Sequence, residues 1–274
     1  MDAVRVGLVG VGRLSEVGYI PALRALDSAE LVAVADVRQT RCASVAPGVP
    51  AYPDAAALVA DAAALASLVP RPWLGLNRRF DPGVDRLRQR VAGFHLPLDV
   101  SLEMSTRPSE WGAVTAPPGP LLDLGAHLAD LVIRVTGREC VAVRAHRIDD
   151  AVARFEILLD GGRVLVIGSH ESGWRESVVV RDATGARAKL TRGGRARRVA
   201  LTLLSGRRSP LVATLAAQLA AACAAVRTGV VDEHLATADH GLVIMGILDA
   251  AGVSARREGA WIELAANGVA ACSR

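Results

Sequence analysis

Lysine is nearly absent from this chain of 274 residues, where Lys189 is the only one and arginine supplies the rest of the 32 basic side chains. Aromatic residues are also scarce, at 3% of the chain, which leaves few platforms on which nucleic-acid bases can stack. The net charge of +4 is scattered, apart from a basic run at Arg192–Arg198 that is typical of a turn between strands. We therefore expect no nucleic-acid partner.

The cysteines are too few and too far apart for a metal site or a disulfide framework. Cys42, Cys140, Cys223 and Cys272 form no Cys-x-x-Cys pair and have no histidine at ligand spacing, so they are typical of reduced cytosolic thiols. No basic segment followed by an apolar run opens the sequence, and the longest nearly uncharged stretch, residues 211–226, is shorter than the ~20 residues of a membrane span. We expect a cytoplasmic protein without a metal or a membrane partner.

The chain does contain enough hydrophobic material for a sizeable core. A composition of 51% hydrophobic and 22% charged residues is that of a globular protein, and the length suits one large domain or two ordinary ones. Strand and helix alternate in the first third, and short alternating strands dominate afterwards. We expect an α/β protein, with a truncated Rossmann-like dinucleotide-binding domain at residues 1–92 and an α+β domain with a large, open, mostly antiparallel sheet at residues 93–274.

The N-terminal segment predicts a strand, a glycine turn and a helix. An apolar run at Val4–Val9 is broken by Gly10 and Gly12, helical periodicity continues to Leu26, and a second apolar run ends in Asp36. In dinucleotide-binding proteins, such glycines let the backbone approach a pyrophosphate at a helix N-terminus, and an acid at the tip of the second strand binds the ribose hydroxyls. The order of these elements predicts a cofactor site.

The residues predicted to bind the cofactor are Gly10, Gly12, Arg13, Leu14 and Asp36. The charge of Asp36 disfavours a 2′-phosphate and so favours NAD, while Arg38 and Arg41 leave NADP open. Ser15 stands where the fingerprint has a glycine or alanine for close packing of helix and strand. The alternative is that the glycines serve only a tight turn in an α/β domain without a cofactor.

The alternation of strands and helices is cut short after a helix expected from Asp54. Two apolar runs, Leu65–Val69 and Trp73–Leu76, are separated only by Pro70, Arg71 and Pro72, whereas a parallel crossover needs about a dozen residues. Either the two runs are antiparallel, or one of them is not a strand of the sheet. A further helix is predicted from Asp81, with the aspartate as its N-cap and a proline in its first turn.

The rest of the sequence predicts an antiparallel sheet followed by two helices. The expected strands lie at residues 97–105, 141–148, 151–170, 176–190, 197–204 and 260–264, and Asp160-Gly161 marks a two-residue hairpin inside the third range. The expected helices are Ser209–Thr228 and Thr237–Ala251.

Residues 117–137 predict a helix with one apolar and one polar face. Apolar residues recur at helical spacing, at Leu124, Leu128, Leu131, Val132 and Val135. Polar residues recur at i, i+4, i+7 and i+11, at Asp123, His127, Asp130 and Arg134. A carboxylate one turn from a histidine can fix its tautomer and raise its basicity, which a general acid/base needs near neutral pH. The alternative is a solvated or salt-bridged face.

Four segments together resemble the glucose-fructose oxidoreductase, inositol dehydrogenase and MocA (Gfo/Idh/MocA) family, over nearly the whole chain. They are the first βαβ unit from Val4, "GLNRRFDPGVDRLR", "GPLLDLGAHLADLVIRVTG" and "ATADHGLVIMGILDAAGVSARREGAWIEL". The resemblance implies binding of NAD(P) and action on sugars, polyols or nucleotide-linked sugars. It also implies that Asp123 and His127 bind and deprotonate the substrate alcohol, and that the open sheet joins a homodimer or a higher even oligomer.

The chain departs from that family at one motif. The family normally carries Glu-Lys-Pro after its fifth strand, and the lysine contacts both the substrate and the nicotinamide ribose; no such tripeptide occurs here, and Lys189 falls in a predicted hairpin. The linker Pro70-Arg71-Pro72 stands where the motif is expected. Arg71 or Arg78 is a candidate to fill the gap.

Three functions follow from this pattern. The first is an NAD(P)-dependent oxidoreductase that acts on a hydroxyl or keto group of a sugar-like molecule, with His127 and Asp123 as its acid/base pair. The second is a redox-neutral enzyme, such as an isomerase, cyclase or dehydratase, and the third is a non-catalytic dimeric module. His170, Glu171 and Trp174 lie either at the mouth of a substrate site or on a wet sheet edge, and the sequence favours the edge.

Overall fold

The computed structural model describes residues 3–36, 38–53, 73–111, 119–193 and 210–264. The chain forms two compact units, one of residues 1–80 with 206–237 and the other of residues 81–205 with 238–274. This division differs from the boundary expected at residue 92. Helix α4 (Pro82–Val91) groups with the second unit, and helix α8 (Pro210–Thr228) groups with the first.

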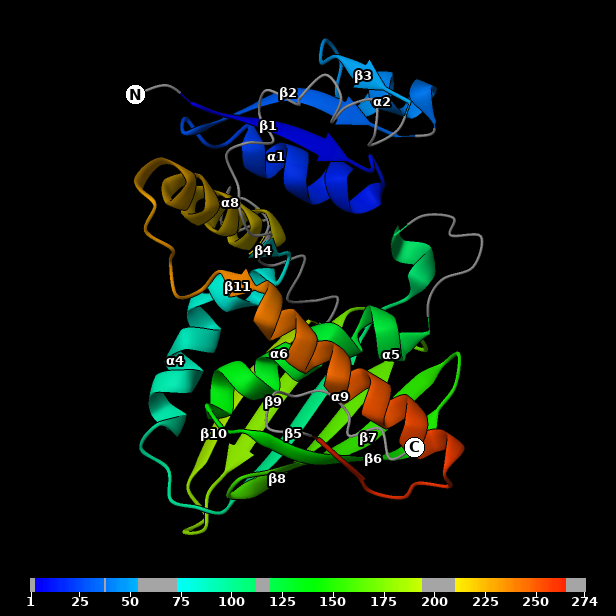
Figure 1. Cartoon of the computed structure of the whole chain (residues 1–274), viewed down its shortest axis with the longest axis vertical. Coiled ribbons are helices and arrows are strands. Elements are labelled where there is room, and N and C mark those ends of the chain that lie inside the picture. Colours follow the sequence, from blue (N-terminus) through cyan, green and yellow to red (C-terminus); the bar gives the residue numbers. More distant parts are fainter. Residues whose placement is uncertain (1–2, 37, 54–72, 112–118, 194–209, 265–274) are drawn as a thin grey trace. The chain divides into compact units, whose positions relative to one another are not determined.

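The first unit contains the predicted strand, turn and helix. Strands β1 (Val4–Val9), β2 (Ala29–Ala35) and β3 (Ala51–Tyr52) form a parallel sheet in the order β1-β2-β3 (Figure 1). The connection from β1 to β2 contains a π-helical segment, η1 (Ser15–Tyr19), and α1 (Ile20–Leu23). Helix α2 (Gln39–Val45) connects β2 to β3.

Helix α8 completes the core of the first unit from a distant part of the sequence. Its Leu215 lies in one buried cluster with Ala22, and its Cys223 lies in another with Leu23. By length and composition alone, the 19 residues of α8 are apolar enough to cross a membrane. The burial of Leu215 and Cys223 accounts for the apolar character of that face within the protein.

Trp73 does not extend the parallel sheet. Strand β4 (Trp73–Leu74) pairs with β11 (Ala236–Thr237) as a separate antiparallel ribbon, and the 3-10 helix η3 (Asn77–Phe80) follows it. Of the two alternatives left by the sequence, the structure therefore shows that this run is not a strand of the β1-β2-β3 sheet. The expected helix from Asp54, the run Leu65–Val69 and the linker Pro70–Pro72 lie outside the described residues.

The second unit is built on a mostly antiparallel sheet, as the sequence predicts. Its strand order is β10-β9-β5-β8-β7-β6-β12, and β5 and β8 form the parallel pair among its described pairings. The strands are β5 (Leu98–Ser105), β6 (Cys140–Ile148), β7 (Val152–Leu159), β8 (Gly162–Ser169), β9 (Arg175–Arg181), β10 (Arg187–Gly193) and β12 (Ile262–Glu263). The Asp160-Gly161 hairpin is confirmed, with Gly161 at a φ of +89°. The strand expected at residues 197–204 lies outside the described residues.

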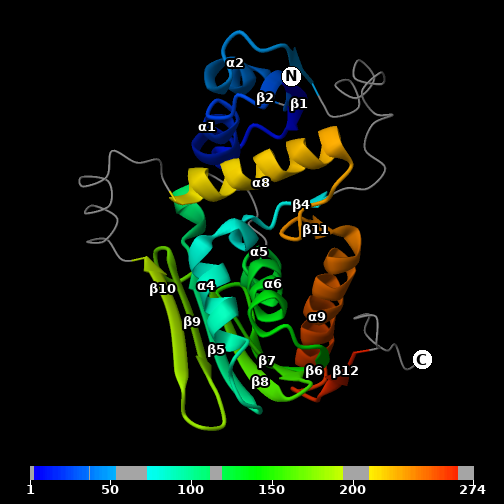
Figure 2. The same ribbon diagram turned by 90° about the vertical axis from the view of Figure 1, so that its left-hand side faces the viewer.

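Three described helices pack on one face of this sheet, namely α4, α6 (Gly125–Thr136) and α9 (Ala238–Arg256) (Figures 1 and 2). The predicted apolar face of α6 is buried, since Leu124, Leu128, Leu131, Val132 and Val135 are each at most 4% exposed. A short helix, α5 (Pro120–Asp123), precedes α6, and a 3-10 turn, η4 (Pro108–Trp111), follows β5.

The start of α4 follows the sequence prediction in detail. Asp81 is its N-cap, and the carboxylate accepts a hydrogen bond of 2.7 Å from the backbone N–H of Gly83. Pro82 occupies the first turn, where its missing N–H costs nothing. Asp81 also forms an ion pair with Arg192 of β10. This ion pair connects the start of α4 to the sheet.

Candidate functional site

The glycine turn after β1 leaves space above its backbone. Gly10 has a φ of +85°, a conformation that side chains of L-residues rarely adopt, and its N–H donates a 2.7 Å hydrogen bond to the carbonyl of Ala35. Gly12 has no such restriction, and a methyl group built there meets no protein atom within 4 Å. The backbone conformation therefore explains the glycine at position 10, whereas neither conformation nor packing explains the one at position 12.

Ser15 takes the place of the third glycine for a reason that the structure shows. Its hydroxyl donates a 2.6 Å hydrogen bond to the carbonyl of Gly10, and the residue is only 6% exposed. The serine thus ties the first turn of the helical segment to the glycine turn. Its small size satisfies the same packing constraint that a glycine or alanine would satisfy.

Asp36 lies at the tip of β2, against the glycine turn. One carboxylate oxygen accepts a 2.8 Å hydrogen bond from the N–H of Val11, and the other accepts a 2.9 Å bond from the N–H of Arg38. These bonds, the one from Arg38 foremost, lower the pKa of Asp36 although burial opposes the shift. The ionised carboxylate therefore holds the turn and the strand tip together.

The remaining predicted cofactor residues border the same turn. Arg13 pairs with Glu16 at 3.1 Å and its side chain is 45% exposed, while Leu14 is 41% exposed. Arg41 donates through Nε to the carbonyl of Val11 at 2.6 Å and pairs with Glu16 at 3.1 Å. All five predicted residues thus belong to the first unit, with Asp36 at the tip of β2 and the other four in or beside the glycine turn.

The second predicted cluster is arranged differently from the expectation. The helix expected to run through Asp123 and His127 is divided at Leu124, so that Asp123 ends α5 and His127 lies in the first turn of α6. The Oδ2 atom of Asp123 lies 2.9 Å from Nε2 of His170, which follows β8. The carboxylate therefore pairs with a histidine that follows a strand of the sheet, and the predicted fixing of His127 by Asp123 stays a prediction.

The sheet places His170 by strand alternation. Val164, Val166 and Gly168 face the helices from β8, and His170 continues this even-numbered series one residue past the strand. A methyl group at Gly168 would lie 3.3 Å from the carbonyl oxygen of Pro120, so the glycine allows α5 to approach the strand closely. The even-numbered spacing from Val164 to His170 was the sequence signal that the His170 side chain faces the helices. The sequence instead favoured a solvent-exposed position at a sheet edge, which is wrong for this side chain, because it is only 7% exposed.

The later residues of the polar face predicted for residues 117–137, here called the polar stripe, lie in the interior or pair with another helix of the second unit. Arg134 pairs with Asp85 of α4 at 3.2 Å, and Asp130 is 1% exposed. The salt-bridged alternative therefore applies to the C-terminal half of the stripe. At its start, the side chain of Asp123 is 43% exposed and accessible to a ligand.

Other candidates from the sequence lie apart from this cluster. Glu171 is exposed, whereas Trp174 is half-buried. Lys189 is exposed on β10, opposite Val179 of β9, which confirms the predicted hairpin position. Arg71 lies outside the described residues, and within the described part of the chain no group of three histidine, cysteine, aspartate or glutamate side chains can hold a metal ion.

Solved structures with the same architecture include dehydrogenases. They include a myo-inositol dehydrogenase from Lactobacillus casei in complex with NAD(H) and myo-inositol, which is 13% identical, with 96% of this chain and 97% of that chain covered at a TM-score of 0.71. A myo-inositol 2-dehydrogenase from Lactobacillus plantarum is 13% identical over 96% and 100% of the two chains, at a TM-score of 0.75. The chain shares the fold of these dehydrogenases.

A third structure extends the comparison beyond inositol. An oxidoreductase from Agrobacterium radiobacter in complex with NAD+, L-tartaric acid and magnesium is 16% identical over 96% of this chain and 98% of that chain, at a TM-score of 0.72. No protein-family model matches the sequence, and no curated protein matches it. The fold implied by the sequence resemblance is confirmed at the level of structure.

Proposed function

We propose that the protein is an NAD-dependent oxidoreductase of small hydroxylated molecules, with Asp123 and His127 at the substrate. The glycine turn is the observation that carries this proposal. Gly12 faces open space and has no packing role, so a ligand that approaches the backbone closely accounts for it. Two of the solved structures that share the fold, those from Lactobacillus casei and Agrobacterium radiobacter, contain NAD(H) or NAD+.

The residues of the first unit fit a dinucleotide. The backbone of Gly10–Gly12 would meet the pyrophosphate, and Arg13 and Leu14 border the same turn. Asp36 is ionised, which favours ribose hydroxyls over a 2′-phosphate. Arg38 and Arg41 both already bind groups of the protein, so they give NADP no special support.

The second unit supplies the groups for the substrate. The half-exposed carboxylate of Asp123 would accept a hydrogen bond from one substrate hydroxyl, and the imidazole of His127 would take the proton of the hydroxyl that is oxidised. A bound nicotinamide would supply the hydride acceptor. The carbon that carries the oxidised hydroxyl would lose a hydride while its oxygen loses the proton, so that a carbonyl forms.

A two-part experiment tests this function. We expect isothermal titration calorimetry of the purified protein to show binding of NAD+ that Asp36→Ala abolishes. We also expect reduction of NAD+ at 340 nm with a polyol from a panel that includes myo-inositol, and loss of that reduction in His127→Ala. Glu30→Ala, at an exposed position of β2, is the matched control for both.

The outcomes separate the three functions. Conversion of a substrate while the absorbance at 340 nm stays constant supports the redox-neutral enzyme. Failure to bind any nicotinamide dinucleotide or any polyol contradicts the proposal and leaves the dimeric module. Turnover that survives in His127→Ala excludes the acid/base role of this histidine.

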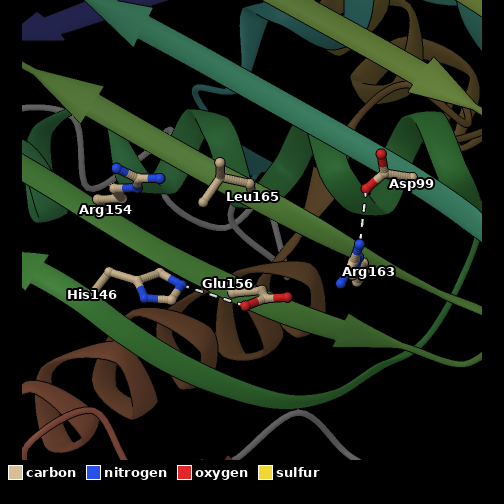
Figure 3. A pocket seen from close by; sticks show the side chains of 6 residues that line it. All are labelled: Asp99, His146, Arg154, Glu156, Arg163 and Leu165. Atoms are coloured by element: carbon tan, nitrogen blue, oxygen red, sulfur yellow. Dashed lines mark ion pairs between the residues drawn. The ribbon is translucent and has the colours of Figure 1, made fainter.

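We also propose that the protein is a homodimer or a higher even oligomer through the face of the large sheet opposite α4, α6 and α9. This face carries a cavity of about 260 Å³ lined by Asp99, His146, Arg154, Glu156, Arg163 and Leu165 (Figure 3). Among the lining side chains, Asp99 lies 3.6 Å from Arg163 and Glu156 lies 3.4 Å from His146. Light scattering of Leu165→Glu against wild type tests the interface, since a monomer is expected only for the variant.

A further inference from the structure

The pair formed by Asp123 and His170 has a marked asymmetry of burial. The His170 side chain is 7% exposed, whereas the Asp123 side chain is 43% exposed, although Nε2 and Oδ2 lie 2.9 Å apart. When the histidine of a carboxylate–histidine pair acts as the base, its imidazole has to reach the substrate. In this pair the exposures are the opposite, because the carboxylate is accessible and the imidazole is buried.

The backbone around His170 fixes its imidazole on the sheet. The N–H of His170 donates a 2.9 Å hydrogen bond to the carbonyl of Ala151, which continues the pairing of β7 and β8 beyond the last strand residue. The hydrogen bond to Asp123 therefore connects the end of an interior strand of the sheet to the end of α5. Gly168 allows this approach, because a methyl group there would press on Pro120 and Leu124.

Helix α5 alone does not set the direction of the Asp123 carboxylate. The helix has only four residues, its N-cap Gly119 offers no side-chain cap, and Asp123 is its last residue. Among the described residues, His170 is the hydrogen-bond partner of that carboxylate. With Oδ2 engaged, the lone pairs of Oδ1 are left to accept a hydrogen bond from a ligand hydroxyl.

We propose that His170 is a positioning residue of the substrate site, which donates Nε2–H to Asp123 and thereby aims Oδ1 at a hydroxyl of the substrate. His170 does not touch the substrate and moves no proton in the reaction. The inference rests on the proposed function in one respect, namely that Asp123 binds a substrate hydroxyl. The pair itself is a property of the second unit and is measurable without a substrate.

The first arm of the test is nitrogen-15 NMR of histidine-labelled protein above pH 8, where a neutral imidazole shows its tautomer. The His170 resonances are assigned by their absence from His170→Gln. We expect His170 as the Nε2–H tautomer, and we expect its Nε2 resonance to shift in Asp123→Asn but not in Asp232→Asn, which removes the partner of His234 at 2.8 Å. An Nδ1–H tautomer, or no shift in Asp123→Asn, overturns the inference.

The second arm measures binding and turnover with the polyol that gives the highest rate in the panel. We expect His170→Phe, which keeps a ring and removes the donor, to raise KM about tenfold or more, because a hydrogen bond to a charged group is lost. His170→Gln, which restores an N–H, should recover most of that loss. The affinity for NAD+ should stay unchanged in both variants, as should the KM of the control His234→Phe.

The two arms keep the inference and the proposed function distinguishable. A His170→Phe variant with an unchanged KM overturns the inference while the oxidoreductase function stands. A wild-type protein that turns over no polyol contradicts the function, and the NMR arm then still decides whether His170 holds the carboxylate. An equal loss in His170→Phe and His170→Gln also overturns the inference, since it indicates a packing role of the imidazole.

Discussion

Replacement of Gly12 by alanine should separate stability from cofactor binding. A methyl group at this position meets no protein atom within 4 Å, and the φ of Gly12 is not in the left-handed region, so the folded chain accepts it without strain. Gly→Ala at a compatible position stabilises a protein by about 0.4–1 kcal/mol, because the unfolded chain loses freedom. We expect the melting temperature of Gly12→Ala to equal or exceed that of wild type by up to about 4 °C.

The same methyl group should interfere with a pyrophosphate at the turn. If it displaces one charge-assisted hydrogen bond between backbone and phosphate, the loss is about 1.5–3 kcal/mol, or roughly 10- to 150-fold in Kd. Calorimetric titration with NAD+ measures this, and Gly93→Ala, at a glycine of the second unit with no close contact, is the control. Unchanged NAD+ affinity in Gly12→Ala would refute our explanation of this glycine.

Three further predictions concern stability, each measured by urea unfolding. Ser15→Gly, which restores the dinucleotide fingerprint, should lower the unfolding free energy by about 1 kcal/mol, since the hydrogen bond to Gly10 is lost; an increase would contradict this. Asp81→Ala should cost about 3 kcal/mol or more, because it leaves Arg192 without its buried partner, and adding Arg192→Leu should restore part of the loss. Backbone hydrogen bonds, that from His95 foremost, lower the pKa of Asp182 from 3.8 to about 2, so its stabilisation is complete above pH 4 and disappears as the pH falls through 2. Asp182→Asn should therefore be less stable at pH 6, with a difference that vanishes near pH 2; a constant difference would exclude this origin.

Elements with a strong local signal were predictable from the sequence. Strand β1 has the predicted bounds Val4–Val9, because a glycine ends the apolar run. The turn at Gly161 follows from the Asp-Gly pair, and the N-cap of α4 follows from Asp81 and the proline after it. In each case the residues that decide the conformation lie within a few positions of one another, so spacing alone is sufficient.

Features that depend on distant contacts were not predictable in this way. The pairing of β4 with β11 connects Trp73 to a partner more than 160 residues later. The predicted helix is divided at Leu124 and Asp123 pairs with His170, and neither periodicity nor charge spacing indicates such a break or such a partner. The sequence predicted Asp123 as a site residue, and its carboxylate is accessible in the structure, but the hydrogen bond to His170 was not predicted.

The path of the chain between the two units affects the order in which they can be completed during synthesis. The second segment of the first unit is residues 206–237. Ala22 and Leu23 therefore cannot be buried against Leu215 and Cys223 until those residues have been synthesised. At ribosomal rates of about 5–20 residues per second, that delay is on the order of ten to forty seconds. A fragment that ends at residue 92 lacks this cover altogether. Isolation of the first unit therefore requires joining residues 1–80 to residues 206–237, and simple C-terminal truncation is expected to expose its core.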